Sequence, residues 1–152
     1  MKNKPAQITH LFVYGTLRKA VGHPMHRILE EYGVYRGMGE FRGELYHLGC
    51  FPAAVASALR TGRVLGEIYR LRPTRKALEQ LDAYEGPQFR RARTSMLVNG
   101  KSAIRAWIYL YMGRLDAHRR IHSGDYVAFL NDPEFHTRKS LEKPGGILSR
   151  QR

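Results

Sequence analysis

The sequence predicts an α+β protein, a small mixed β-barrel or curved sheet with two or three packed helices. The chain has 152 residues, of which 43% are hydrophobic, so it fits one domain that can bury a core without metals or disulfides. Short apolar and β-branched runs separated by glycine dominate. These runs follow one another as hairpins rather than alternating with helices, which favours a mixed barrel over a doubly wound sheet.

The first two elements are predicted to be a buried strand and a short helix. The run ITHLFVYGTL, residues 8–17, is apolar and β-branched until Gly15 breaks it, so the strand is expected to end in a loop. In GHPMHRILEEYG, residues 22–33, apolar side chains recur at helical spacing between an early proline and a final glycine, which predicts a helix.

Extended structure is predicted to follow this helix. Residues 33–48, GVYRGMGEFRGELYHL, are expected to form a strand, a turn and a second strand. Residues 50–57, CFPAAVAS, continue the extended pattern. Residues 61–71, TGRVLGEIYRL, predict a turn and another strong strand.

The clearest helix is predicted for residues 72–86, RPTRKALEQLDAYEG. Thr74 is expected to cap its N-terminus, and apolar residues line one side. Gly86 followed by Pro87 prevents the helix from continuing.

A hairpin and a short helix are predicted in the rest of the chain. Asn99–Gly100 separates two β-rich runs and is a strong two-residue turn signal. SGDYVAFL, residues 123–130, predicts one short helix or packed turn. We therefore expect a single domain over residues 1–136, followed by a basic, flexible tail over residues 137–152, which is polar and contains Pro-Gly-Gly.

The charge of the chain leaves one class of partner open. The 26 Lys and Arg residues against 13 Asp and Glu residues give a formal net charge of +13, which attracts anions of every kind. The basic residues are spread along the chain, and no nucleic-acid-binding motif accompanies them. A nucleic-acid-associated role therefore rests on charge alone, and a basic surface without that role is the simpler interpretation.

The sequence predicts no membrane segment, no metal and a cytoplasmic location. No apolar run reaches the ~20 residues of a membrane helix, and the N-terminus lacks a signal-peptide core. Cys50 is the single cysteine and has no CxxC partner, so we expect a buried structural thiol in a cytoplasmic protein. The histidines lack metal-ligand spacing, and His118 and His122 are expected at the surface, so we predict no metal. A monomer is expected.

The stretch VYGTLR, residues 13–18, is the first candidate site. A glycine where a buried strand ends lets the backbone turn sharply, and successive amides can then bind a carboxylate or a developing oxyanion. Thr16 would add a hydroxyl donor, and Tyr14 a wall. The alternative is that Gly15 only makes a turn and Thr16 caps the next segment.

The stretch LDAYEG contains the second candidate site, Asp82 and Glu85. Their spacing of three places them on neighbouring helical positions. Glu85 lies at the predicted C-terminal end of the helix, where the dipole disfavours negative charge and raises the pKa of a buried carboxyl. A general base that acts near neutral pH requires such a pKa. The alternative is a surface ion pair between Glu85 and Arg90 or Arg91.

The combination of these motifs resembles the gamma-glutamylcyclotransferase-like superfamily, in particular its AIG2-like and gamma-glutamylamine cyclotransferase branch. The motifs are VYGTL after a buried strand, a helix that ends LDAYEG, the strand that begins FRR and the strand AWIYLY. The resemblance runs from about Leu11 to Leu130 and includes FPA at 51–53 and SGDY at 123–126. It implies a small mixed β-barrel with helices packed outside and one cavity.

The resemblance also implies an activity and its residues. The substrate would be a small-molecule gamma-glutamyl amide, converted to 5-oxoproline and a free amine without a metal or cofactor. Glu85 would be the catalytic acid and base, and Asp82 supporting structure. The substrate-binding loop would consist of Tyr14, Gly15, Thr16 and Leu17.

One position departs from the family's pattern. Four residues after the glutamate the family commonly has tyrosine, whereas this chain has Phe89, which cannot donate a hydrogen bond. Tyr109 or Tyr111 is expected to line the pocket instead. Many members of this branch have no established substrate, so the alternative function on the same fold is a non-catalytic binding protein for a carboxylated metabolite.

Overall fold

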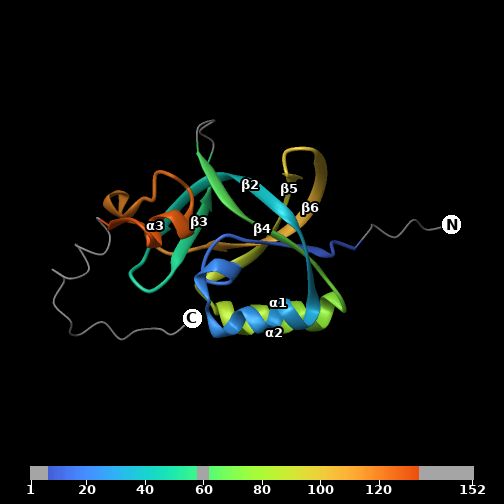
Figure 1. Cartoon of the computed structure of the whole chain (residues 1–152). Helices are drawn as coiled ribbons and strands as arrows, with labels where there is room; N and C mark the ends of the chain where they lie inside the picture. The colour runs from blue at the N-terminus through green and yellow to red at the C-terminus, as the bar shows by residue number, and fades with distance from the viewer. Residues whose placement is uncertain (1–6, 58–61, 134–152) are drawn as a thin grey trace.

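The strands of the protein form one sheet that closes on itself. In a computed structural model, which describes residues 7–57 and 62–133, the strand order is β3-β2-β4-β1-β6-β5, and β2 also pairs with β5. This second pairing closes β2, β4, β1, β6 and β5 into a barrel, with β3 as an extra strand on β2 (Figure 1). The strands are β1 (His10–Val13), β2 (Gly33–His47), β3 (Pro52–Ala56), β4 (Arg63–Leu71), β5 (Phe89–Val98) and β6 (Ser102–Tyr111).

The helices lie outside the barrel. They are α1 (Arg27–Tyr32), α2 (Thr74–Glu85) and α3 (Tyr126–Leu130), with the 3-10 turns η1 (Lys19–Val21), η2 (Pro24–His26) and η3 (Ala117–Arg119). α1 and α2 pack together on one side, and α3 lies near β3 (Figure 1). Strands β1 and β6 pair in parallel, and β1 pairs with β4 in antiparallel fashion. The predicted α+β class, a small mixed β-barrel with two or three helices, is confirmed.

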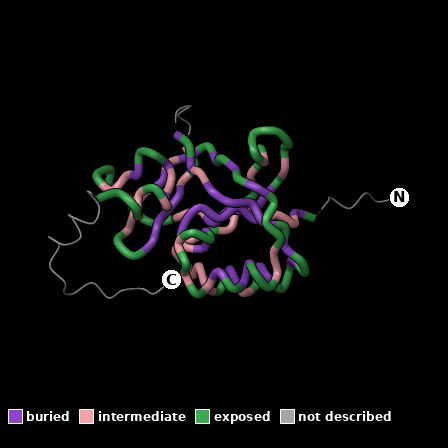
Figure 2. Tube along the Cα trace, in the orientation of Figure 1, coloured by how far each residue is buried: buried purple, intermediate pink, exposed green. Residues whose placement is uncertain are grey.

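Alternating side chains of β1 join two parts of the hydrophobic core. Phe12 packs in one cluster with Ile68 and other residues of the barrel strands. Leu11 and Val13 face the other way and belong to a second cluster, which contains Leu81 of α2. β1 is therefore covered on both faces, and Figure 2 shows it inside the buried centre of the molecule. Burial of apolar surface on both sides holds the end of this strand in place.

The segment predicted as strand, turn and strand over residues 33–48 instead contains one long strand, β2, over residues 33–47. β2 pairs along β4 and then along β3, with a bulge between Tyr35 and Gly37. Its glycines allow neighbouring strands to approach closely: a Cβ on Gly39 would lie 2.7 Å from Cδ1 of Ile68. The sequence cannot distinguish such a glycine from one that makes a turn, since both are small and break the apolar pattern.

Several smaller predictions can be compared with the structure. The hairpin turn at Asn99 and Gly100 is confirmed, since both residues have left-handed φ values, of 51° and 71°. The loop is one residue longer than predicted, because Val98 pairs with Ser102 and the amide of Lys101 donates to the carbonyl of Val98 at 3.0 Å. Thr74 does not cap α2, because it is already the first helical residue and its hydroxyl donates to the carbonyl of Leu71 at 2.9 Å. α3 is the short helix expected within residues 123–130.

The prediction that Cys50 is buried is wrong, since the thiol residue is exposed. It lies in a tight connection between β2 and β3, where the amide of Leu48 donates to the carbonyl of Phe51 at 2.8 Å. A residue at the tip of such a turn faces solvent. His118 and His122 are exposed, as predicted.

Two expectations lie partly or wholly outside the described residues. They are the tail over 137–152 and the end of the domain at residue 136. Among the helices of the described residues, none is both long and apolar enough to cross a membrane.

The loop that follows β1 packs against the first residue of β3. A Cβ on Gly15 would collide with the Cγ of Pro52. Gly15 is not among the glycines with positive φ, so its backbone does not require glycine, but the close approach of the Pro52 ring does. The backbone does turn after Gly15, as predicted, but glycine is required there by the contact with Pro52 and not by its own φ.

Gly15→Ala is expected to lower the free energy of unfolding by about 1–3 kcal/mol, because it overpacks this contact. Pro52→Ala removes the atoms that would collide, so the double variant should lose less than the sum of the two single losses. Denaturant unfolding of the four proteins measures this coupling, which should exceed about 0.5 kcal/mol. Additive losses would show that the two residues do not meet in this way.

Candidate functional site

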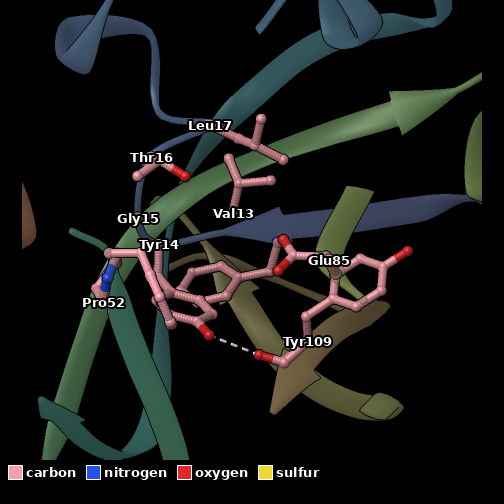
Figure 3. A pocket seen from close by; sticks show the side chains of 10 residues that line it. Val13, Tyr14, Gly15, Thr16, Leu17, Pro52, Glu85 and Tyr109 are labelled. Atoms are coloured by element: carbon pink, nitrogen blue, oxygen red, sulfur yellow. Dashed lines mark hydrogen bonds between the residues drawn. The ribbon is translucent and has the colours of Figure 1, made fainter. Parts of the chain in front are cut away.

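A pocket at the end of β1 brings the two predicted sites together. Its enclosed volume is small, about 30 Å³, and the pocket opens to solvent. The residues that line it are Phe12, Val13, Tyr14, Gly15, Thr16, Leu17, Phe51, Pro52, Glu85 and Tyr109 (Figure 3). The predicted loop and the predicted glutamate, far apart in the sequence, therefore lie at one pocket.

Tyr14 holds the loop to the barrel. Its hydroxyl donates to the backbone carbonyl of Tyr109 on β6 at 2.6 Å (Figure 3). The same hydroxyl accepts from the amide of Ala54 on β3 at 3.3 Å. The residue is buried, with 7% of its surface exposed. Its side chain is thus a wall of the pocket, as predicted, and also ties the loop to strands on two sides.

The loop backbone turns at the pocket. The amide of Arg18 donates to the carbonyl of Gly15 at 3.0 Å, which closes a turn. Nδ1 of His26 donates to the carbonyl of Leu17 at 2.7 Å. Among the backbone hydrogen bonds of turns, loops and caps in the described residues, none is donated by the amide of Thr16 or of Leu17. Two successive amides in such a turn can donate to a carboxylate or an oxyanion.

The hydroxyl of Thr16 does not cap a following helix. It lies 3.2 Å from the hydroxyl of Tyr84, near the C-terminal end of α2. The ring of Tyr84 in turn lies 5.8 Å from that of His23. The loop and the end of α2 therefore meet directly, next to the pocket.

Glu85 is the last residue of α2 and is half-buried. Its carboxylate points into the pocket, toward the loop that follows β1 (Figure 3). Gly86 ends the helix with φ of 77°, and its amide donates to the carbonyl of Asp82 at 3.1 Å. With this positive φ and a ψ of -176°, Gly86 is outside helical geometry in a conformation that favours glycine, so the helix stops directly after the glutamate. The carboxylate thus lies at the end of a helix and at the mouth of the pocket.

Asp82 has a different environment from Glu85. It accepts a hydrogen bond from the hydroxyl of Tyr109 at 2.6 Å and two from Arg91, at 2.9 and 3.2 Å. The Arg91 guanidinium also lies 4.3 Å from the centre of the Trp107 ring. Burial, followed by the hydrogen bond to Asp82, raises the pKa of Tyr109 above its ordinary value. Asp82 therefore joins the end of α2 to β5 and β6, and Arg91 pairs with it.

The choice between Tyr109 and Tyr111 falls on Tyr109, which lines the pocket. Tyr111 instead packs its ring against Phe89, with centroids 5.5 Å apart. Phe89 also packs against Phe51, at 5.9 Å. The phenylalanine that departs from the family's pattern thus forms an aromatic contact behind Phe51, where a hydroxyl is not needed for packing.

Phe51 and Pro52 line the pocket, although the sequence analysis does not predict this. The FPA motif was recognised, but nothing in the sequence shows that β3 reaches back to the loop after β1. The described residues contain no group of three or more His, Cys, Asp and Glu side chains that could hold a metal ion.

Comparison with known proteins identifies relatives of this chain. A family model described as gamma-glutamyl cyclotransferase, AIG2-like, matches residues 11–128. The chain is 32% identical over 120 residues to the gamma-glutamylcyclotransferase family protein YtfP of Escherichia coli, covering 77% of this chain and 95% of YtfP.

Solved structures share the fold. The solution structure of YtfP has a TM-score of 0.56, with 31% identity over 77% of this chain and 95% of that chain. YkqA from Bacillus subtilis has a TM-score of 0.64 and 24% identity; it covers 91% of this chain, which spans 44% of YkqA. An AIG2-like protein from Mus musculus has a TM-score of 0.54 and 22% identity, over 80% of this chain and 96% of that chain. The barrel, the pocket and these matches lead to one conclusion: the chain belongs to the AIG2-like gamma-glutamyl cyclotransferase family.

Proposed function

We propose that the protein converts a gamma-glutamyl amide, of an amino acid or an amine, into 5-oxoproline and a free amine. The observation that carries this proposal is that the Glu85 carboxylate and the loop Tyr14–Leu17 line the same pocket. Family membership supports a reaction of this class. The pocket combines a proton acceptor with backbone donors, and these are the two groups that such an acyl transfer needs.

The proton transfers are assigned to Glu85. The α-amine of the substrate has a free pKa near 8, so at neutral pH it is mostly protonated and cannot attack. Glu85 accepts a proton from this amine, whose nitrogen then attacks the γ-carbonyl carbon and closes a five-membered ring. As the bond to the leaving nitrogen breaks, Glu85 returns this proton to that nitrogen and accepts the second proton that the attacking nitrogen loses on becoming the lactam N–H. The released amine takes up this second proton, so the products are 5-oxoproline and a protonated amine. The substrate supplies both the nucleophile and the leaving group, so the reaction is a redox-neutral exchange of one C–N bond for another.

The loop is assigned to charge stabilisation. When the amine attacks, the γ-carbonyl oxygen becomes an oxyanion, and the amides of Thr16 and Leu17 are the donors proposed to stabilise it or to hold the glutamyl end. Loss of one such donor typically costs about 3 kcal/mol of transition-state stabilisation. The apolar walls, which include Phe12 and Phe51, would keep the substrate folded so that its amine faces its own carbonyl.

The proposal is tested by the release of 5-oxoproline from a panel of gamma-glutamyl amino acids and gamma-glutamyl amines. Glu85→Gln keeps the shape of the side chain but removes the base, so turnover should fall by about 10²- to 10⁴-fold. Glu79→Gln is the matched control, because Glu79 lies on the same helix and its side chain is 67% exposed, in an ion pair with Arg75. The control should retain full turnover.

Two results would contradict the proposal in different ways. Equal turnover by wild type and folded Glu85→Gln would show that Glu85 is not the base. An inert wild type across the whole panel would favour the binding-protein alternative, in which case 5-oxoproline or glutamate should still bind at the loop.

Asp82→Asn tests the separate assignment of the second carboxylate. Asparagine can still accept from the Tyr109 hydroxyl but loses the charge that pairs with Arg91. Turnover should fall by less than about tenfold, and the free energy of unfolding by about 1 kcal/mol, since a partly exposed ion pair contributes little. Both quantities are measured for each variant. Loss of turnover in Asp82→Asn together with full turnover in Glu85→Gln would show that Asp82, and not Glu85, is the catalytic carboxylate.

A further inference from the structure

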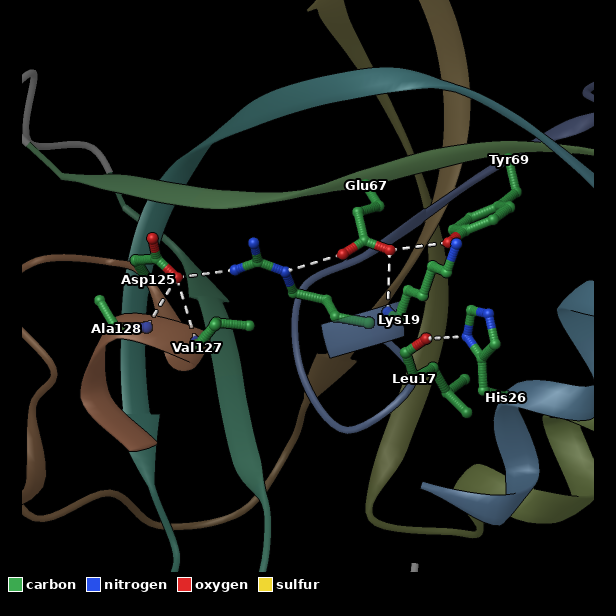
Figure 4. A network of polar contacts seen from close by, with 9 residues as sticks. Leu17, Lys19, His26, Glu67, Tyr69, Asp125, Val127 and Ala128 are labelled. Carbon is green, nitrogen blue, oxygen red and sulfur yellow. Dashed lines mark hydrogen bonds and ion pairs between the residues drawn. The ribbon is translucent and has the colours of Figure 1, made fainter. Parts of the chain in front are cut away.

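Two buried charged residues lie on the far side of the loop from the pocket. Arg18 and Glu67 are each 6% exposed, and Nε of Arg18 lies 3.2 Å from Oε2 of Glu67 (Figure 4). Neither residue lines the pocket. Glu67 comes from β4, in the middle of the barrel wall beside Val13 of β1. The chemistry proposed above does not use this carboxylate.

Both carboxylate oxygens of Glu67 accept hydrogen bonds. Oε1 accepts from the backbone amide of Lys19 at 3.1 Å and from the hydroxyl of Tyr69 at 2.7 Å. Oε2 accepts from Nε of Arg18. Two of these three donors belong to the residues that directly follow Leu17. One carboxylate therefore holds both the backbone and a side chain at the C-terminal end of the loop (Figure 4).

Arg18 extends the network to the last helix. Its NH1 atom lies 2.8 Å from Oδ1 of Asp125. Asp125 is also the N-cap of α3, because the same oxygen accepts from the amides of Val127 and Ala128 at 3.0 and 3.2 Å. The Arg18 guanidinium is thus held between a carboxylate of the barrel wall and one at the start of α3.

The amides proposed to act on the substrate lie between fixed points. Before them, Tyr14 is bonded to β6 and β3. After them, the carbonyl of Leu17 accepts from His26, and Lys19 donates to Glu67. A buried ion pair is weak evidence of a gain in stability, because the loss of hydration offsets the attraction between the charges. Its geometric effect, a fixed loop, is the better reason for these charges.

We propose that Glu67, through Arg18 and the Lys19 amide, is a positioning residue that sets the geometry of the Thr16 and Leu17 amides. The inference rests on the proposed function of those amides. Glu67 touches no reacting atom; it acts through the loop. Such supporting groups affect catalysis, because a small displacement of a hydrogen-bond donor destabilises the transition state more than the ground state.

Glu67→Gln is the test variant, and Glu40→Gln is its matched control. The control makes the same chemical change in an exposed ion pair with Arg63, where the Glu40 side chain is 53% exposed. In folded Glu67→Gln, kcat for 5-oxoproline release should fall at least tenfold, with a smaller change in KM. The acidic limb of the pH profile should not move, because Glu67 does not exchange the proton. The control should match wild type within twofold.

Amide hydrogen exchange gives a readout that does not need turnover. The Arg18 amide, which donates to Gly15, should exchange at least tenfold faster in Glu67→Gln, while the amides of β5 and β6 keep their rates. Faster exchange over the whole barrel would indicate a purely structural role and would overturn the proposal. Unchanged kcat with unchanged exchange at Arg18 would overturn it as well.

Asp125→Asn carries the test if Glu67→Gln does not fold. Asparagine remains a good helix cap, but the charge that pairs with Arg18 is lost. A threefold or larger fall in kcat, with faster exchange at Arg18 alone, supports the proposal, and wild-type values for both overturn it. If wild type itself is inert, the proposed function fails. The exchange measurement then decides by itself whether Glu67 holds the loop.

Discussion

Burial of α2 against the outer face of β1 is the constraint on which the pocket depends. Leu11 and Val13 pack in the same cluster as Leu81, while Phe12 belongs to the barrel interior. Because β1 is buried on both faces, neither it nor the helix can shift without exposing apolar surface. The end of the strand and the end of the helix are therefore held next to each other, and Glu85 faces the loop as a consequence.

The three carboxylates near the loop have different surroundings. Asp82 accepts from Tyr109 and Arg91 and so joins the helix to the barrel. Glu67 accepts from the backbone and from buried side chains behind the loop. Glu85, which follows both in the chain, faces the pocket. The hydrogen bonds of Asp82 and Glu67 hold the end of α2 and the loop in place, and the proton transfer proposed for Glu85 depends on that geometry.

Some sequence patterns specify a structure more closely than others. The position of the Asn99–Gly100 turn was predicted correctly, because few pairs of residues readily adopt left-handed φ values at two successive positions. The turn predicted within residues 33–48 was wrong, since glycine marks both turns and close packing between strands. Cys50 was expected in the core from its residue type alone, but its place in a tight connection exposes it.

The sequence by itself determined the fold class from local patterns, and from the order of its motifs it determined the family. The same resemblance predicted roles for Glu85 and the loop Tyr14–Leu17, which line one pocket. Only the tertiary structure decided that Tyr109 rather than Tyr111 lines the pocket, that Pro52 closes it, and that Glu67 lies behind the loop. The physical reason is the range of the interactions. Turns, caps and periodicity are set by neighbours in the chain, whereas these contacts join strands that meet only when the barrel closes.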